Sequence, residues 1–165
     1  MAEVRNLDVI LADLDQTARR LALAAEGFSP EELIYKPGGN EFSFTEQVWH
    51  LRDLEEIGYG NRIDRILSED RPMFQDINGL KLAMERGYNN FPFASGLAEF
   101  EQLRDANIKR VRSLGPVELQ RVGYFEGGPD LVLTDILGAM HEHDLEHLEQ
   151  VATLRQTLLN AQTPA

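Results

Sequence analysis

Three histidines are the residues of this sequence best suited to chemistry. His143 and His147 stand four residues apart near the C-terminal end, and His50 lies in a separate segment. At about 100° per residue, a four-residue spacing places two side chains on neighbouring turns of one helix face. A His-x-x-x-His pair of this kind can present two imidazoles to a single metal ion.

The apolar pattern around the pair indicates that both histidines face the interior of the protein. The residues at core spacing in this segment are Ile136, Met140, His143, His147, Val151, Leu154 and Leu158. The two histidines therefore replace apolar residues on an inward face. His141 is two residues from His143, about 200° around the helix, and should face away. Taken alone, the pair leaves an alternative open, because core histidines can also hydrogen-bond to each other, to water or to acids.

His50 favours the metal site over that alternative. It precedes Leu54 by one turn and Ile57 by two, on one side of its predicted helix. A lone histidine of this kind is usually structural, but with the pair it supplies a third neutral nitrogen ligand. Burial of three imidazoles without a shared partner is costly, and a metal ion offsets that cost. Three histidine ligands also leave one coordination position open, which is typical of catalytic sites.

Acidic residues flank the histidines, and any of them could orient an imidazole or act as a general base. They are Asp53, Glu55, Glu56, Asp144 and Glu146. Charged residues on bundle helices mostly lie on solvated faces, so we predict that these are exposed and assign no catalytic residue. Gln150 follows His147 by one turn and could reach the site or a neighbouring helix. Trp49 lies about 100° from His50 and is interpreted as a packing residue.

Length and composition predict one soluble domain over residues 1–165. The apolar fraction is 42%, and no run approaches the roughly 20 apolar residues that span a bilayer. The first residues form neither a basic stretch nor an apolar signal core, so we expect a cytoplasmic protein. The absence of cysteine excludes disulfides, thiolate ligands and a cysteine nucleophile from this chain.

The net charge of the chain indicates which classes of partner are disfavoured. Sixteen basic and 28 acidic residues leave a formal charge of −12, and Lys and Arg form no block. A surface of this sign repels phosphate backbones and anionic lipid. We therefore expect a small-molecule substrate, with no nucleic acid and no membrane as partner.

Four long helical patterns must position the histidines. They cover residues 7–26, 43–68, 95–114 and 134–159. The second begins with the capping-box spacing of Ser43 and Glu46, the third is stopped by Gly115 and Pro116, and Thr134 is the predicted cap of the fourth.

The connections between these patterns are less regular. Ser29 and Pro30 predict the start of a short helix, and residues 36–40 a loop. Residues 74–93 predict an irregular crossover with room for a short helix, and residues 117–129 a short extended excursion. Since no convincing set of strands is present, the fold class predicted is an all-α four-helix bundle with one long crossover.

Two segments of this sequence resemble the DinB-like superfamily of metal-dependent hydrolases and thiol transferases. Residues 42–55 (FSFTEQVWHLRDLE) are similar to the capped second helix of that family, in which a histidine is followed by Leu, Asp and Glu. Residues 141–150 (HEHDLEHLEQ) are similar to its closing His-Asp-x-x-His-x-x-Gln segment. Between them, Arg62-Ile63, Arg71-Pro72-Met73 and Asp76 match an Arg-Ile step and a proline-containing turn. The resemblance extends from about Phe42 to Leu158.

The resemblance implies a bundle with an up-down-down-up connection that is often dimeric, so a homodimer is expected. The metal-ligand positions of the family fall on His50, His143 and His147, and the ion would be divalent, with zinc or nickel favoured. Characterised relatives include transferases and isomerases that use low-molecular-weight thiols such as glutathione, mycothiol or bacillithiol. We therefore expect a metal-dependent enzyme with a thiol cosubstrate, and thiol transfer ahead of hydrolysis. The alternatives are a metal-dependent hydrolase, a non-catalytic metal- or ligand-binding module, and a structural bundle whose histidines only hydrogen-bond.

Overall fold

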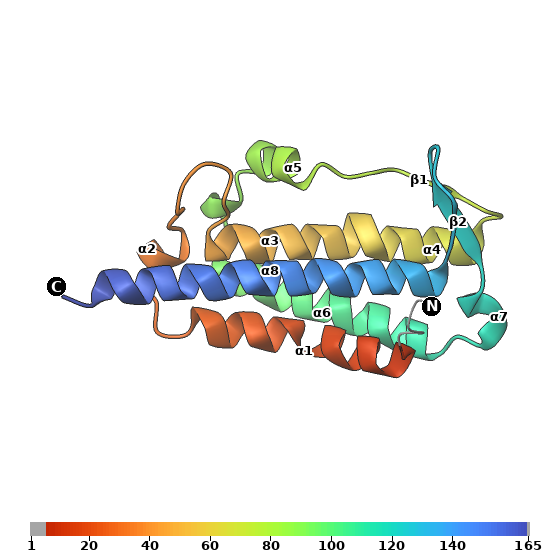
Figure 1. The fold of residues 1–165 in the computed structure, drawn as a ribbon, viewed down its shortest axis with the longest axis horizontal. Coiled ribbons are helices and arrows are strands. Elements are labelled where there is room, and N and C mark those ends of the chain that lie inside the picture. Colours follow the sequence, from red (N-terminus) through yellow and green to blue (C-terminus); the bar gives the residue numbers. More distant parts are fainter. Residues whose placement is uncertain (1–5, 165) are drawn as a thin grey trace.

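The computed structural model describes residues 6–164, and its long helices form a four-helix bundle (Figure 1). The second long helical segment consists of three consecutive elements, α3, η1 and α4. The long elements are α1 (Leu7–Ala25), α3 (Phe44–Asp53), η1 (Leu54–Gly60), α4 (Asn61–Ser68), α6 (Phe93–Arg112) and α8 (Leu133–Gln162). The short helices of the connections are α2 (Pro30–Leu33), α5 (Gly79–Arg86), η2 (Tyr88–Asn90) and α7 (Pro116–Leu119). The predicted bundle is thus confirmed.

The direction of the helices explains the long crossover. Helices α1 and α8 run one way along the bundle, whereas α3–α4 and α6 both run the other way (Figure 1). Because α3–α4 and α6 are parallel, the chain must return along the whole bundle between Ser68 and Phe93. This return carries α5 and η2 past α3, and it gives the up-down-down-up order expected above.

Helix starts are set by side chains that satisfy the first free N–H groups. Ser43 Oγ accepts from the Glu46 N–H at 3.1 Å, and Glu46 Oε2 accepts from the Ser43 N–H at 2.9 Å, which completes the predicted capping box. The prediction of Thr134 as the cap of α8 is wrong. That helix begins at Leu133, because strand β3 (Asp130–Val132) runs directly into it and Asp135 Oδ2 accepts from the Val132 N–H at 3.0 Å.

A small sheet at one end of the bundle was not predicted. It consists of β1 (Met73–Phe74), β2 (Val122–Phe125) and β3 (Asp130–Val132), in the order β1-β2-β3. The β2–β3 hairpin is the predicted extended excursion, although that excursion starts later than expected, after α7. Its parallel pairing with β1 joins it to the distant crossover.

The second long helix contains a π-helical stretch, η1, where the sequence predicts an uninterrupted α-helix. Gly60 makes the wide turn possible, since a Cβ there would overlap the carbonyl oxygen of Glu55. A π turn inserts residues into the helical repeat and shifts which side chains face inward. Ile57, expected on the side of His50, is consequently exposed, whereas Glu55 and Tyr59 are buried.

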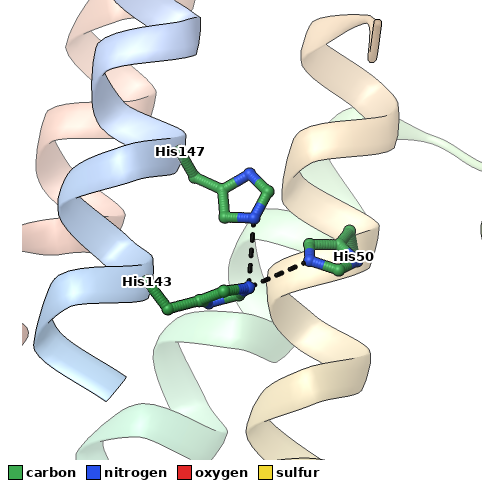
Figure 2. Close-up of side chains that lie close together, drawn as sticks. All are labelled: His50, His143 and His147. Atoms are coloured by element: carbon green, nitrogen blue, oxygen red, sulfur yellow. Dashed lines mark hydrogen bonds between the residues drawn. The ribbon is translucent and has the colours of Figure 1, made fainter. Parts of the chain in front are cut away.

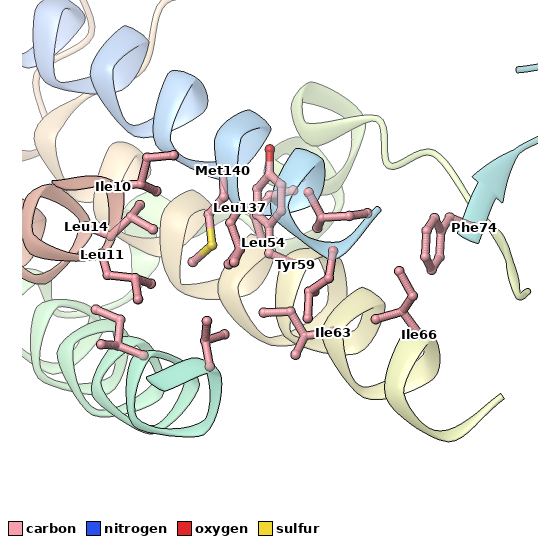
Figure 3. Close-up of a cluster of buried hydrophobic side chains, with 14 residues drawn as sticks. Ile10, Leu11, Leu14, Leu54, Tyr59, Ile63, Ile66, Phe74, Leu137 and Met140 are labelled. Carbon is pink, nitrogen blue, oxygen red and sulfur yellow. The ribbon is translucent and has the colours of Figure 1, made fainter. Parts of the chain in front are cut away.

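Two apolar clusters fill the bundle, one toward each end. Figure 3 draws the cluster near the sheet, which includes Leu14, Leu54 and Met140. The other cluster includes Ala18, Leu51 and Leu148. Seven buried polar residues lie at or near the boundary between the two clusters, and every long helical segment contributes at least one of them: Thr17, His50, Asp53, Glu55, Arg104, Asp144 and His147. The bundle is therefore divided at its middle by a polar layer. Within residues 6–164 no helix has the length and apolar character needed to span a membrane.

Candidate metal centre

The three predicted ligands converge in this polar layer (Figure 2). His50 comes from α3, and His143 and His147 come from successive turns of α8. The Nε2 atom of His143 lies 3.2 Å from His50 Nε2 and 3.1 Å from His147 Nε2. One potential ligand atom from each residue lies within 4.8 Å of the other two. The sequence thus identified three side chains that the fold brings together.

The two distances from His143 Nε2 to the other histidine nitrogens fit tetrahedral coordination of a metal ion. Zinc–nitrogen bonds of about 2.0–2.1 Å place two ligand nitrogens about 3.3 Å apart, close to the 3.1 and 3.2 Å separations at His143. A single two-centre hydrogen bond cannot satisfy this arrangement. The Nε2 atom of His143 carries either one N–H or one lone pair, yet it faces two other nitrogens. A cation that receives a lone pair from each ring satisfies all three.

All three imidazoles are held in the neutral form that binds a metal. Burial, with a smaller contribution from His143, lowers the pKa of His50 to about 3. Burial lowers the pKa of His147 to about 2, and the neighbouring histidines add to the effect. Burial also lowers the pKa of His143, although Asp144 acts in the opposite direction. Burial therefore favours the neutral form of each ring, which is the form that binds a metal.

A pair of glutamines orients His147. The Nδ1 atom of His147 lies 2.5 Å from Gln47 Oε1, and Gln47 Nε2 donates to Gln150 Oε1 at 2.9 Å. Because an amide oxygen only accepts, Nδ1 carries the hydrogen and Nε2 keeps its lone pair for the centre. Gln150 thus reaches a neighbouring helix, as was considered possible. Gln47 was missed, although it precedes His50 by about one turn on the same helix face.

His50 is held by packing. Its side chain is 5% exposed, and its Nδ1 atom has no hydrogen-bond partner in the described part of the chain. Gly79, the first residue of α5, lies against the ring so closely that a Cβ there would overlap it. The Phe42 ring lies 5.3 Å from the His50 ring and stacks on His147 at 6.5 Å. The sequence presented Gly79 only as a helix breaker, so this contact was not foreseen.

A cavity of about 830 Å³ opens from the histidines. One side is a stripe of α8 that begins at His143 and ends at Thr157, and the opposite side comes from α3, α5 and the loop before α3. The lining residues are Pro37, Asn40, Glu41, Phe42, Gln47, His50, Leu80, His143, Glu146, His147, Glu149, Gln150, Thr153, Leu154 and Thr157. A volume of this size admits a small organic molecule whose end reaches the three nitrogens.

Three of the acids predicted to be solvated are buried, so that prediction is wrong for them. Asp53, Glu55 and Asp144 are each at most 2% exposed. Arg104, itself buried on α6, donates to Asp144 Oδ2 at 2.6 Å and to Glu55 Oε1 at 2.9 Å. The Tyr88 hydroxyl donates to Asp53 Oδ2 at 2.6 Å. These partners compensate for the burial of the charges. The burial of Arg104 could have been predicted from the sequence, because the residue stands at core spacing on α6.

The remaining side chains behave as predicted. Glu56 and Glu146 are exposed, and Glu146 lines the cavity. His141 faces away from the centre, and its Nε2 atom lies 3.0 Å from Asp13 Oδ2. The indole N–H of Trp49 donates to the Pro92 carbonyl at 3.1 Å, in agreement with a packing role.

Comparison with known proteins places the chain in a family. No curated protein matches it. Among solved structures, YfiT from Bacillus subtilis has the same fold, with a TM-score of 0.84 at 18% identity over 96% of this chain and 90% of that one. YfiT is described as a probable metal-dependent hydrolase with an unusual four-helix bundle topology. The model of the DinB superfamily matches residues 13–151. The chain belongs to the DinB superfamily.

Proposed function

We propose that this protein is a divalent-metal-dependent enzyme in which His50, His143 and His147 hold the ion. The observation that carries the proposal is the set of three histidine nitrogens within 4.8 Å of one another, beside a cavity. With three protein ligands, the fourth position is left for a substrate. The description of YfiT as a probable metal-dependent hydrolase supports the same chemistry. Zinc and nickel are the ions we favour for three imidazoles.

The reaction we propose first is transfer of a small thiol to an electrophile. A divalent ion held by His50, His143 and His147 would keep its double positive charge, because all three ligands are neutral, and would lower the pKa of a bound thiol. The protein side chains then act on geometry and access. Gln47 fixes the His147 ring through Nδ1, and Phe42 and Gly79 hold the His50 ring against movement. Glu146 lines the cavity near His143, where its carboxylate can accept the proton that the thiol releases.

Hydrolysis is the second candidate, and two observations favour it. YfiT carries that description, and Glu146 is also placed to accept a proton from an attacking water. The two reactions would share the histidines and differ in the nucleophile that enters the cavity.

A paired assay distinguishes these reactions. Metal-loaded protein is tested with a series of small thiols and a chromogenic aryl halide, and separately with activated esters and amides. We expect turnover that depends on the added metal and is lost in His147→Ala. Turnover only with the esters or amides would favour hydrolysis. Stoichiometric metal without turnover in either assay would contradict the enzyme and leave a metal-binding module.

A further inference from the structure

The cavity beside the histidines is lined by charge of one sign. Three carboxylates line it, those of Glu41, Glu146 and Glu149, whereas none of its described lining residues is Lys or Arg. The whole chain adds to this field with a formal charge of −12. A cleft with low-dielectric walls and charges of one sign concentrates ligands of the opposite sign.

These carboxylates differ from other acids near the centre in their ionic contacts. Within residues 6–164, none of the three forms an ion pair. By contrast, Asp53, Glu55 and Asp144 all contact an arginine. The charges of the cavity are therefore available to a ligand and are not neutralised by the protein.

Their positions match a ligand anchored at the histidines. Glu146 lies on α8 between His143 and His147, and Glu149 follows on the next turn of the cavity-facing stripe. Glu41 faces them from the loop before α3, beside the Phe42 ring that stacks on His147. A ligand with one end at the histidines shares the cavity with these carboxylates. The stripe continues to Thr157, about 15 Å beyond His147 at 1.5 Å per residue.

We propose that this cavity selects molecules whose tail is neutral or positively charged, and that Glu41, Glu146 and Glu149 discriminate against tails with carboxylates or phosphates. The proposal rests on the proposed function, because a metal at the histidines is what anchors the reacting end. The three histidines define where a ligand binds, and the three carboxylates determine which ligands are selected. An amine-bearing or uncharged thiol is thus the expected cosubstrate, ahead of one with several acidic groups.

Cobalt-substituted protein tests this selection without an assay of activity. Cysteamine, 2-mercaptoethanol and 3-mercaptopropionate carry a positive, a neutral and a negative tail, and a bound thiolate gives a charge-transfer band with cobalt. We expect affinity to fall in that order, with a ratio of about tenfold between the first and last at low salt. Because these charges border solvent, the ratio should shrink in about 0.5 M salt.

The three thiols also differ in the pKa of the thiol group, which affects affinity independently of the tail charge. Two variants separate these effects. The double variant Glu146→Gln/Glu149→Gln removes two charges from the cavity. The control Glu101→Gln/Glu126→Gln removes two exposed charges elsewhere, on α6 and in the β2–β3 turn, which do not line the cavity. We expect the ratio of cysteamine to 3-mercaptopropionate affinity to fall about threefold or more in the first variant and to be unchanged in the control.

The outcomes separate this inference from the proposed thiol transfer. If thiols bind and the ratio of cysteamine to 3-mercaptopropionate affinity is the same in the parent and in Glu146→Gln/Glu149→Gln, the proposed charge selection is overturned. The proposal of thiol transfer would stand. Histamine and imidazole-4-acetate, which bind a metal through a ring nitrogen, test the same selection without a thiol. If cobalt binds no thiol but prefers histamine, and the cavity variant loses that preference, the selection holds and thiol transfer fails. If no probe binds to the cobalt protein, both proposals fail.

Discussion

Two buried polar clusters share the middle layer of this bundle and differ in how their hydrogen-bonding groups are satisfied. One is the histidine centre, made of His50, His143 and His147. The other, here called the Arg104 network, consists of Thr17, Glu55, Arg104, Asn107 and Asp144. They meet at consecutive residues of α8, since His143 belongs to the first and Asp144 to the second.

The Arg104 network is complete within the protein. Arg104 donates to Glu55, to Asp144 and, at 2.9 Å, to the Leu14 carbonyl. The Thr17 hydroxyl donates to Asp144 Oδ2 at 2.5 Å, so the network joins α1, η1, α6 and α8. Burial lowers the pKa of Arg104, but its contacts with Glu55 and Asp144 raise it. The net result is a pKa above the usual value for arginine. Such a network specifies how the helices pack.

The histidine centre is incomplete by the same criterion. The Nε2 atom of His143 faces the Nε2 atoms of both other rings, and a two-centre hydrogen bond satisfies only one of these contacts. The two clusters differ in what their polar groups indicate. A cluster with its own counter-charges holds the fold, whereas one that lacks a partner indicates a ligand.

The largest expected effect is on stability, from the Arg104 network. Arg104→Met leaves the carboxylates of Glu55 and Asp144 buried without a counter-charge. We expect a loss of about 3–5 kcal/mol in the free energy of unfolding, measured by urea titration of the apoprotein. Lys109→Met, which removes an exposed ion pair on the same helix, should change it by less than about 1 kcal/mol. A similar, small loss in both variants would contradict the structural role of the network.

The histidine centre was predictable from sequence, whereas the Arg104 network was not. The apolar stripe of residues 134–159 places His143 and His147 inside from local spacing alone, and His50 is positioned by its own helix. The burial of Glu55 depends on Arg104, which lies 49 residues away along the chain, and no local pattern reports such a pairing. Acids near the histidines were consequently predicted to be solvated.

Backbone irregularities escaped prediction for a related reason. The π-helical turn at residues 54–60 requires Gly60, but a glycine inside a helical pattern has several explanations. The role of Gly79 depends on where the crossover brings α5, which is a property of the tertiary structure. The four helices themselves were predictable, because each has its own apolar stripe, and Ser43 with Glu46 marks the start of one helix while Gly115 and Pro116 mark the end of another.

The next largest effect is expected at Gly79. In Gly79→Ala the new methyl group overlaps the His50 ring and should displace it from the centre. We expect a decrease of about 10–100-fold in metal affinity, of the size seen when the support of a ligand is lost. Circular dichroism should show the helical content unchanged, since alanine favours α5. Lys81→Ala, an exposed change on the same helix, is the control, and equal affinity in both variants would show that Gly79 does not position His50.

A smaller effect is expected at Gln47, which accepts from Nδ1 of His147. Gln47→Leu removes the acceptor, and metal affinity measured by competition with a chelator should fall about tenfold. Gln47→Glu keeps an oxygen acceptor at this position and should retain most of the affinity. If both variants lose the metal equally, the contact with His147 is not what matters at this residue.

The metal content of the purified protein shows whether His50, His143 and His147 form a metal centre. The protein is purified without an affinity tag or a chelator, beside His143→Ala, and both are measured by elemental analysis. We expect about one equivalent of a divalent metal in the parent and little in the variant, with both proteins folded. No metal in either, even after incubation with zinc, nickel or manganese, would contradict the claim that the three histidines form a metal centre.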